Sequence, residues 1–137
     1  TNYTMINTHG DFGVSGAYRG NGEVPGFIPR TGNASFSWDY KKFGLSMSYN
    51  YTSYNIRSFT NTTAANPSGF SRNQYLAPRE LVNVNLRYTI RPNLTATFGV
   101  ANLFNEPQIY YRSINSNQLE TFLINGTTIT GGLEGRF

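Results

Sequence analysis

Aromatic and basic side chains stand close together in two polar stretches of this chain, around residues 72–75 and 110–112. Tyrosine rings offer stacking surfaces, and guanidinium groups donate charge-assisted hydrogen bonds, so both stretches suit the recognition of sugars or acidic chelates. Tyrosine is also common in exposed loops, which is the simpler explanation for any one of these residues. The candidate ligand-contacting residues are Arg72, Tyr75, Tyr110, Tyr111 and Arg112.

His9 and Asp11 are the pair that most resembles catalytic machinery, because some membrane-barrel enzymes place a histidine beside a serine at the rim. The chain has a single His and no Cys. This composition excludes disulfides, thiolate metal sites and multi-histidine metal sites. Since no distinct nucleophile accompanies His9, we predict neither an enzyme nor a bound cofactor.

Charge is scarce and aromatic side chains are abundant in this sequence. Charged residues make up 13% of the chain and aromatic residues 15%. Soluble domains usually carry about twice that charged fraction. The net charge of +4 comes from scattered basic residues, with Lys41 and Lys42 as the one adjacent pair, so we predict no nucleic-acid partner. No apolar run is long enough for a transmembrane helix, although the alternating strands of a membrane barrel would escape that criterion.

Hydrophobic and polar residues alternate with a period of two, which predicts strands with two different faces. In residues 79–90, Val84 and Leu86 face one way, whereas Asn83, Asn85 and Arg87 face the other. The same alternation marks residues 31–40, 43–54, 94–104 and 127–137, and residues 1–7 read as the end of a further strand. An apolar face opposite a polar face is typical of a strand between lipid and a wet lumen. The predicted lumen-facing or plug-facing residues are Asn83, Asn85, Arg87, Glu134 and Arg136.

The connections between these segments alternate in length. Lys41–Lys42 and residues 91–93 are tight turns, whereas residues 8–29, 55–78 and 106–126 are long polar loops. Short periplasmic turns and long extracellular loops are typical of outer-membrane β-barrels. We therefore predict that residues 31–40, 79–90 and 127–137 run towards the periplasm of a bacterial cell, with the C-terminus on that side.

Aromatic side chains on the apolar face should gather at the membrane interfaces. Four such residues fall at the predicted periplasmic ends of their strands, and aliphatic residues occupy the strand middles. This predicted aromatic belt consists of Trp38, Tyr40, Phe43 and Tyr88. On the opposite face, the charged residues of the same half are expected to form an ion-pair network, because charges removed from water need partners. Its members are Asp39, Arg87, Glu134 and Arg136.

The segment NLFNEPQ, residues 102–108, is followed by Tyr110 and Tyr111. It resembles the NLF-[DN]-x-P-Q…Y segment near the C-terminus of TonB-dependent outer-membrane receptors. Residues 29–54 and 81–93 are similar to earlier strands of that family, and residues 129–137 look like its final strand. Thr127–Thr128 differ from the family's more usual G-R-x-aromatic approach to the last strand. Within the segment, we expect asparagine side chains to cap the strand end while Leu103 and Phe104 pack.

The resemblance implies an all-β fold, an antiparallel up-and-down transmembrane barrel of 22 strands. The chain, residues 1–137, would supply the last six strands or so, with the plug domain and earlier strands outside it. It implies active uptake of a scarce solute such as a siderophore, vitamin, oligosaccharide or peptide. The implied partners are outer-membrane lipid, the rest of the barrel with its plug, the TonB complex and the barrel-assembly machinery. By the same resemblance, Phe137 is the terminal aromatic signal that this machinery reads.

Two other classes of protein stay open on the residues alone. One is a passive pore or adhesin barrel without TonB coupling, which the presence of a plug domain would distinguish from a transporter. The other is a soluble β-sandwich that acts as a binding module, which would not need detergent. The nature of the solute stays open in all of these readings.

Overall fold

The chain is built from antiparallel β-strands. The structure, a computed structural model, describes residues 1–8, 24–58, 73–112 and 118–135. Every regular element within these ranges is a strand. The described residues contain no helix long and apolar enough to cross a membrane. The strands form one sheet of six and one sheet of four. The prediction of an all-β, antiparallel fold is therefore confirmed.

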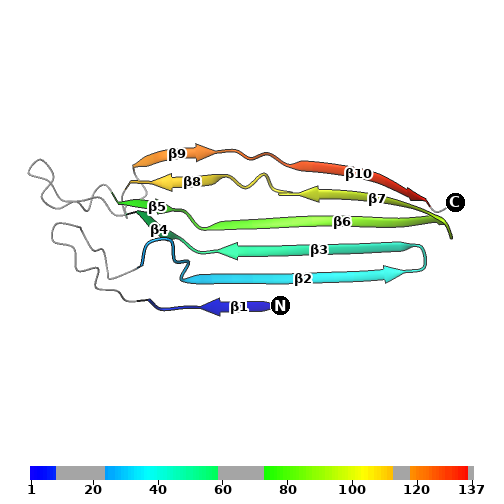
Figure 1. Ribbon diagram of the computed structural model, residues 1–137, viewed down its shortest axis with the longest axis horizontal. Helices are drawn as coiled ribbons and strands as arrows, with labels where there is room; N and C mark the ends of the chain where they lie inside the picture. Colours follow the sequence, from blue (N-terminus) through cyan, green and yellow to red (C-terminus); the bar gives the residue numbers. More distant parts are fainter. Residues whose placement is uncertain (9–23, 59–72, 113–117, 136–137) are drawn as a thin grey trace, which may run out of the picture.

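Five long strands and the four-residue β1 form an up-and-down meander, in which neighbours in the sheet follow one another along the chain apart from the short strands between them (Figure 1). The five predicted alternating segments, and the strand end near the N-terminus, all occur as strands of this sheet. Its order is β1-β2-β3-β6-β7-β10. The bounds are β1 Asn2–Met5, β2 Arg30–Tyr40, β3 Phe43–Thr52, β6 Arg79–Arg91, β7 Leu94–Ala101 and β10 Thr128–Gly135.

Two tight turns set the register of the long sheet. Tyr40 pairs with Phe43 across the first turn, where Lys41 adopts a left-handed backbone with φ 52°. At the second turn Arg91 pairs with Leu94, and Ile90 is an extra residue between two paired positions. The apolar alternation of residues 79–90 and 94–104 predicts that Ile90 matches Leu94 across this turn, and that prediction is wrong. Pro92, whose φ is fixed by its ring, closes the turn one residue later and leaves a bulge.

Four short strands form the second sheet, in segments that the sequence predicts to be loops. They are β4 (Asn55–Ser58), β5 (Gln74–Leu76), β8 (Gln108–Tyr111) and β9 (Leu119–Leu123), in the order β4-β5-β8-β9. The prediction of residues 55–78 and 106–126 as loops is wrong at these positions. Strands of three to five residues are too short to show a clear alternation.

Each short strand extends a long one beyond its end (Figure 1). β4 follows β3 and β5 precedes β6, each across a link of two residues, 53–54 and 77–78. β8 follows β7 across residues 102–107, and β9 precedes β10 across residues 124–127. The order of the short sheet therefore repeats that of β3, β6, β7 and β10. We call β1, β2, β3, β6, β7 and β10 the wall sheet, and β4, β5, β8 and β9 the outer sheet.

Both sheets are open, and the described strands do not close into a barrel. Strands β1 and β10 are the edges of the wall sheet. Within the described residues, the buried hydrophobic side chains are Ile56, 2% exposed, and Tyr75, 5% exposed, and both belong to the outer sheet. The wall sheet has no such core of its own in these ranges. The predicted 22-stranded barrel stays a prediction.

Candidate functional site

The register of the wall sheet places the apolar positions of neighbouring strands side by side. One row runs across four strands through Trp38, Leu45, Leu86 and Phe98, and each residue is the partner of the next. The rows on either side join Phe36, Met47, Val84 and Val100, and Tyr40, Phe43, Tyr88 and Ala96. We call this surface the apolar face. It is uncovered in the structure, since Leu86 is 45% and Phe98 46% exposed.

The predicted aromatic belt lies at the end of the apolar face next to the tight turns. The rings of Trp38 and Tyr40 stack with centroids 5.8 Å apart, and those of Phe43 and Tyr88 are tilted with centroids 4.6 Å apart. Lys41 holds its ammonium group 5.2 Å from the centroid of the Tyr40 ring. The structure thus brings the four predicted residues into one band across β2, β3 and β6. Amphipathic aromatic rings in such a band suit a membrane–water interface.

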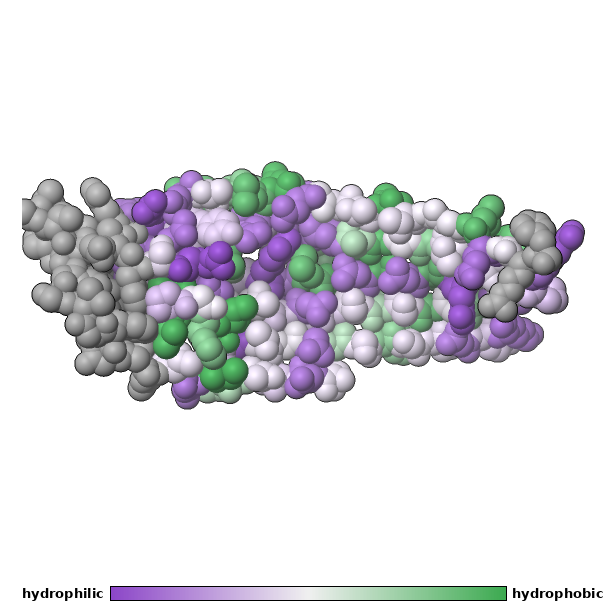
Figure 2. Space-filling model, in the orientation of Figure 1, coloured by the Kyte–Doolittle hydropathy of each residue, from purple (hydrophilic) through white to green (hydrophobic). Residues whose placement is uncertain are grey.

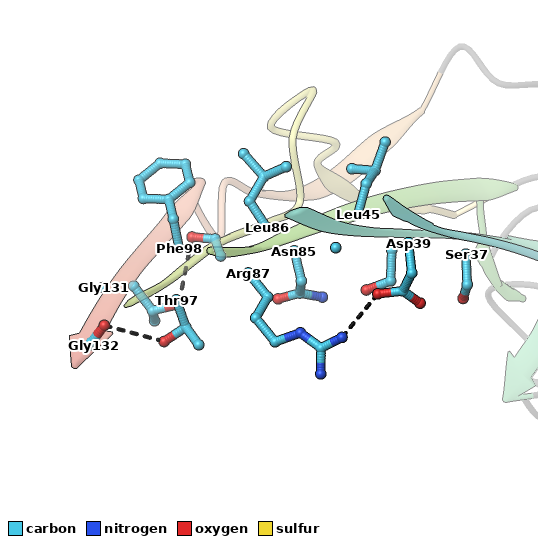
Figure 3. A pocket seen from close by; sticks show the side chains of 14 residues that line it. Ser37, Asp39, Leu45, Asn85, Leu86, Arg87, Thr97, Phe98, Gly131 and Gly132 are labelled. Atoms are coloured by element: carbon cyan, nitrogen blue, oxygen red, sulfur yellow. Dashed lines mark hydrogen bonds and ion pairs between the residues drawn. The ribbon is translucent and has the colours of Figure 1, made fainter. Parts of the chain in front are cut away.

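The opposite side of the wall sheet is polar and hollowed; we call it the polar face. Figure 3 shows Leu86 and Phe98 on one side of the sheet, with Ser37, Asp39 and Arg87 on the other. The hollow has a volume of about 500 Å³ and is lined by residues of β2, β3, β6, β7 and β10. In Figure 2, hydrophilic and near-neutral residues predominate over the long strands, with hydrophobic residues visible between them and at the margins.

An ion pair crosses one strand of the polar face. The Arg87 Nη2 atom on β6 lies 2.8 Å from Asp39 Oδ1 on β2, above Gly44 of the intervening β3. A Cβ atom at Gly44 would stand 2.7 Å from Asp39 Oδ1, so the pair depends on the missing side chain. The predicted ion pairing is confirmed for Arg87 and Asp39. Both side chains are more than 60% exposed, so the pair adds little stability and chiefly orients the two charges.

A second glycine leaves room for two polar side chains, an arrangement that sequence reasoning missed. Asn85 of β6 and Thr130 of β10 lean over Gly99 of β7, where a Cβ atom would meet Asn85 Oδ1 at 2.8 Å and Thr130 Oγ1 at 2.7 Å. In the sequence, this arrangement is signalled by Gly99, the one position of β7 on the polar face that has no side chain. The pairing of Tyr40 with Phe43 sets the register that places Gly44 opposite Asp39.

The two predicted asparagines of β6 therefore have different surroundings. Asn85 lies over Gly99 in the hollow, whereas Asn83 lies outside the hollow, nearer the start of β6. Both the nitrogen and the oxygen of the Asn83 amide form hydrogen bonds. Asn83 donates through Nδ2 to Ser48 Oγ at 3.2 Å and accepts at Oδ1 from the Asn102 backbone N–H at 3.0 Å. Asn83 thus ties β6 to β3 and to the start of the β7–β8 link.

Asn102 is the most heavily hydrogen-bonded residue of the NLF segment. Its Oδ1 accepts from the Glu106 N–H at 2.8 Å, and its Nδ2 donates to the Gly126 carbonyl at 3.0 Å and to the Glu106 carbonyl at 3.4 Å. The predicted capping role is confirmed for this residue. The expected packing of Leu103 and Phe104 is wrong, since they are 39% and 71% exposed. They belong to a turn rather than to β7, which ends at Ala101.

The remaining predicted charged and terminal residues have mixed outcomes. Glu134 of β10 is exposed and pairs in register with Thr95 of β7. Arg72, Arg136 and Phe137 lie outside the described residues. The wider ion-pair network and the terminal assembly signal therefore stay predictions.

The described ligand candidates meet in the outer sheet. Tyr75 of β5 is the register partner of Tyr111 on β8, and Tyr110 is the partner of Leu76. Tyr75 is buried, whereas Tyr110 and Tyr111 are half-buried. The hydroxyl of Tyr110 accepts a hydrogen bond from Gln108 Nε2 at 2.6 Å. The structure thus gathers these rings but uses that of Tyr75 for packing.

A carboxylate joins three strands of the outer sheet. Glu120 on β9 accepts from Gln74 Nε2 on β5 at 2.8 Å and forms an ion pair with Arg112 beyond the end of β8. Hydrogen bonding by Gln74, assisted by the Arg112 guanidinium, lowers the pKa of the Glu120 carboxyl below its ordinary value of 4.5. Arg112 is thereby held against the protein in this structure. Sequence reasoning missed Glu120 because its partners come from strands that it did not predict.

The outer sheet should lose stability in acid because of Glu120. A carboxyl with a lowered folded-state pKa stabilises the fold above its unfolded value, and this contribution disappears as the pH falls through the folded value. We expect the urea midpoint of the outer sheet to drop on acidification below about pH 4.5, starting near the ordinary pKa. NMR signals of β8 and β9 would measure it. The variant Glu120→Gln should show no such drop; an equal drop in that variant would contradict the assignment.

Among the described residues, no group of three or more acidic, His or Cys side chains could hold a metal ion. Comparisons of the chain with protein-family models, with curated proteins and with solved structures found no match. The features that carry a functional argument are thus the apolar face, the hollowed polar face and the outer sheet that extends from one end of both.

Proposed function

We propose that this chain forms part of the wall of an outer-membrane β-barrel, with the apolar face in lipid and the polar face towards the lumen. One observation carries the proposal: the three paired rows that cross all of β2, β3, β6 and β7 on one side are apolar and uncovered, and the charge on that side, Glu80, lies at the far end of β6. The other side carries Asp39, Arg87 and Asn85 around a hollow. A contiguous apolar surface of this extent is unfavourable in water. Lipid on one side and a wet lumen on the other together favour both faces.

The lengths of the strands support this proposal. β2 has 11 residues and β3 has 10. At about 3.3 Å per residue, such strands are roughly 33–36 Å long. At a tilt of about 45° they cover roughly 23–25 Å along the membrane normal, close to the apolar band of about 25 Å on outer-membrane barrels. A β-sandwich would instead bury the apolar face under a second sheet. The described residues contain no strand packed on that face, since the outer sheet extends the wall end to end.

The edges of the wall sheet require further strands. Neither β1 nor β10 has a second neighbour among the described strands. An unpaired backbone edge in lipid costs several kcal/mol for each unsatisfied group, so a wall of this kind must close. We propose that additional strands of a larger barrel pair with both edges, as the resemblance to TonB-dependent receptors implies.

We propose active uptake of a scarce solute, powered through TonB, as the function of that barrel. The support is the NLFNEPQ segment, in which Asn102 has a defined structural task, together with the order of long and short connections. The outer sheet then stands at the extracellular mouth, where Tyr110 and Tyr111 are half-buried. Siderophore, vitamin, oligosaccharide and peptide remain the candidate solutes. Solute uptake that persists without TonB would favour a passive pore.

Trp38 provides the test of the membrane assignment. It is the only Trp of the chain, and its side chain is 48% exposed on the apolar face. We expect bromine atoms on lipid acyl chains to quench its fluorescence strongly after reconstitution into vesicles, because the indole would touch lipid. Depth-selective brominated lipids should quench best when the bromine lies near the headgroups, where the aromatic belt is placed.

A matched control moves the indole by one residue. In a Trp38→Phe background, Ser37→Trp places the only indole on the polar face, beside Asp39. This control should resist lipid quenching and respond to aqueous acrylamide or iodide. Equal quenching by lipid at both positions, or none at Trp38, would overturn the proposed orientation.

A further inference from the structure

The hydrogen-bonded pairing of the wall sheet stops on four adjacent strands, in two steps. Strands β3 and β6 pair as far as Thr52 and Arg79, whereas β6 and β7 pair only as far as Val84 and Val100. The wall sheet ends at Thr52 and begins again at Arg79, and the neighbouring pair breaks after Ala101 and before Thr128. Beyond this level the outer sheet has its own pairing. The two sheets are thus separate hydrogen-bonded units joined by four links (Figure 1). Each of these four strands is thus interrupted by a link, and the links after β7 and before β10 begin lower along the wall than those beside β3 and β6.

One side of this junction is short and packed. The β3–β4 and β5–β6 links have two residues each. Ser53 donates its N–H to the Arg30 carbonyl at 2.9 Å, and its Oγ accepts from the Arg30 N–H at 3.0 Å. Gly26 donates to the Ile56 carbonyl at 2.6 Å, and both Ser53 and Ile56 are buried. These short links and buried backbone bonds prevent the outer sheet from sliding along the wall on this side. A movement of the outer sheet would therefore be a rotation about these two links.

The other side of the junction is long and exposed. Residues 102–107 join β7 to β8, and residues 124–127 join β9 to β10. Phe104 is 71% and Ile124 64% exposed, so little packing holds these links in place. Asn102, Asn105 and Gly126 all have left-handed backbones, with φ of 54°, 53° and 76°. The path of both links thus depends on a few residues that tolerate this conformation.

Asn102 joins the two long links to each other. Its Nδ2 donates to the Gly126 carbonyl of the β9–β10 link, while its Oδ1 holds the Glu106 N–H of its own link. Its carbonyl also accepts from Thr127 Oγ1 at 2.9 Å. Asn102 is only 9% exposed, so these bonds compete little with water. No other described side chain bonds to both links.

We propose that the outer sheet is a hinged flap that turns about the two short links, and that Asn102 is the latch that holds its free side. The flap lets the outer sheet move as one body without breaking the pairing of the wall. This device goes beyond the proposed transport function and does not depend on it. The open and latched positions differ by the side-chain bonds of Asn102 and the hydroxyl bond of Thr127, which a contact at the outer sheet is able to offset.

Two asparagines with nearly the same backbone make a matched test. Asn102→Gly keeps the left-handed conformation without strain and deletes the side-chain bonds of the latch. Asn105→Gly changes the neighbouring left-handed residue, for which only a backbone bond to Asn102 is seen. Spin labels on Leu86→Cys in the wall and Leu119→Cys at the start of β9 would report their separation in the reconstituted protein. Both positions are exposed, and the chain has no other Cys.

The latch predicts a narrow distance distribution in the parent and in Asn105→Gly, and a wider or displaced one in Asn102→Gly. Thr127→Val removes the hydroxyl bond between the links and should widen the distribution as well. A distribution in Asn102→Gly that matches the parent would overturn the latch. A parent distribution that is already as wide as that of Asn102→Gly would overturn it too. Neither outcome depends on transport or on TonB.

Discussion

Replacing Met47 by Arg should remove about 2–4 kcal/mol from the free energy of unfolding of the protein in lipid vesicles, the usual cost of a basic residue on the lipid side at mid-membrane depth. Met47 lies in the middle of the apolar face on β3, between Phe36 and Val84, and is 38% exposed. The guanidinium would have to reach towards water along the strand or stay in hydrocarbon. Reversible urea unfolding from vesicles, followed by Trp38 fluorescence, measures the loss.

The neighbouring Ser46 provides the control, because consecutive residues of a strand point to opposite faces. Ser46→Arg places the same charge on the exposed polar face, next to the hollow. We expect its effect on stability to stay within about 0.5 kcal/mol, as for most surface substitutions. Equal losses in both variants would show that the two faces meet the same medium. A Met47→Arg variant that is more soluble in plain buffer and equally stable would favour a soluble protein.

The wall sheet was predictable because its signal is repeated many times. Each long strand has four or more alternating pairs, and the tight turns tie neighbouring registers together, so that Tyr40 and Phe43 must share a face. The assignment of faces then follows without any knowledge of packing. The alternation also placed Asp39 and Arg87 on one face and so predicted that they pair. It did not predict that their side chains meet above Gly44.

The outer sheet was missed because its strands have too few residues to alternate. Ile56 and Ile124 illustrate the difficulty, since both are isoleucines within segments that the sequence predicts to be loops. Ile56 is buried in β4, whereas Ile124 is 64% exposed in the β9–β10 link. Only the spatial neighbours of each residue distinguish them. Those neighbours come from strands far along the chain, so no local pattern reports them.

The same limit applies to the candidate ligand residues. Tyr75 and Tyr111 look equivalent in the sequence, and the structure pairs them directly. Tyr75 is nevertheless buried while Tyr111 is half-buried, although β5 and β8 are both inner strands of the outer sheet. The Asn102 latch was visible in part, since an asparagine at the end of a strand suggests a cap. Its second partner, Gly126, lies 24 residues away and was not foreseen.

Ile56→Ala should release the outer sheet while the wall stays folded. Ile56 is 2% exposed and pairs with Tyr75, and these two are the buried hydrophobic side chains of the described residues. Truncating a fully buried isoleucine costs about 2–5 kcal/mol, because the transfer energy is lost and a cavity is left. A sheet of four short strands has little other apolar burial to offset that loss. The backbone amides of β4 and β5 should therefore exchange with solvent roughly 25-fold faster or more.

Hydrogen exchange followed by mass spectrometry or NMR would locate this effect, with Ile124→Ala as the matched control. Ile124 is already 64% exposed, so its truncation should leave exchange in both sheets close to that of the parent. In Ile56→Ala, the amides of β3 and β6 should keep their protection, because the wall draws its stability from strand pairing and, in our proposal, from lipid. Equal acceleration in β3 and β4 would mean that the two sheets open together. That result would also argue against a flap, since a sheet that cannot open alone cannot turn alone.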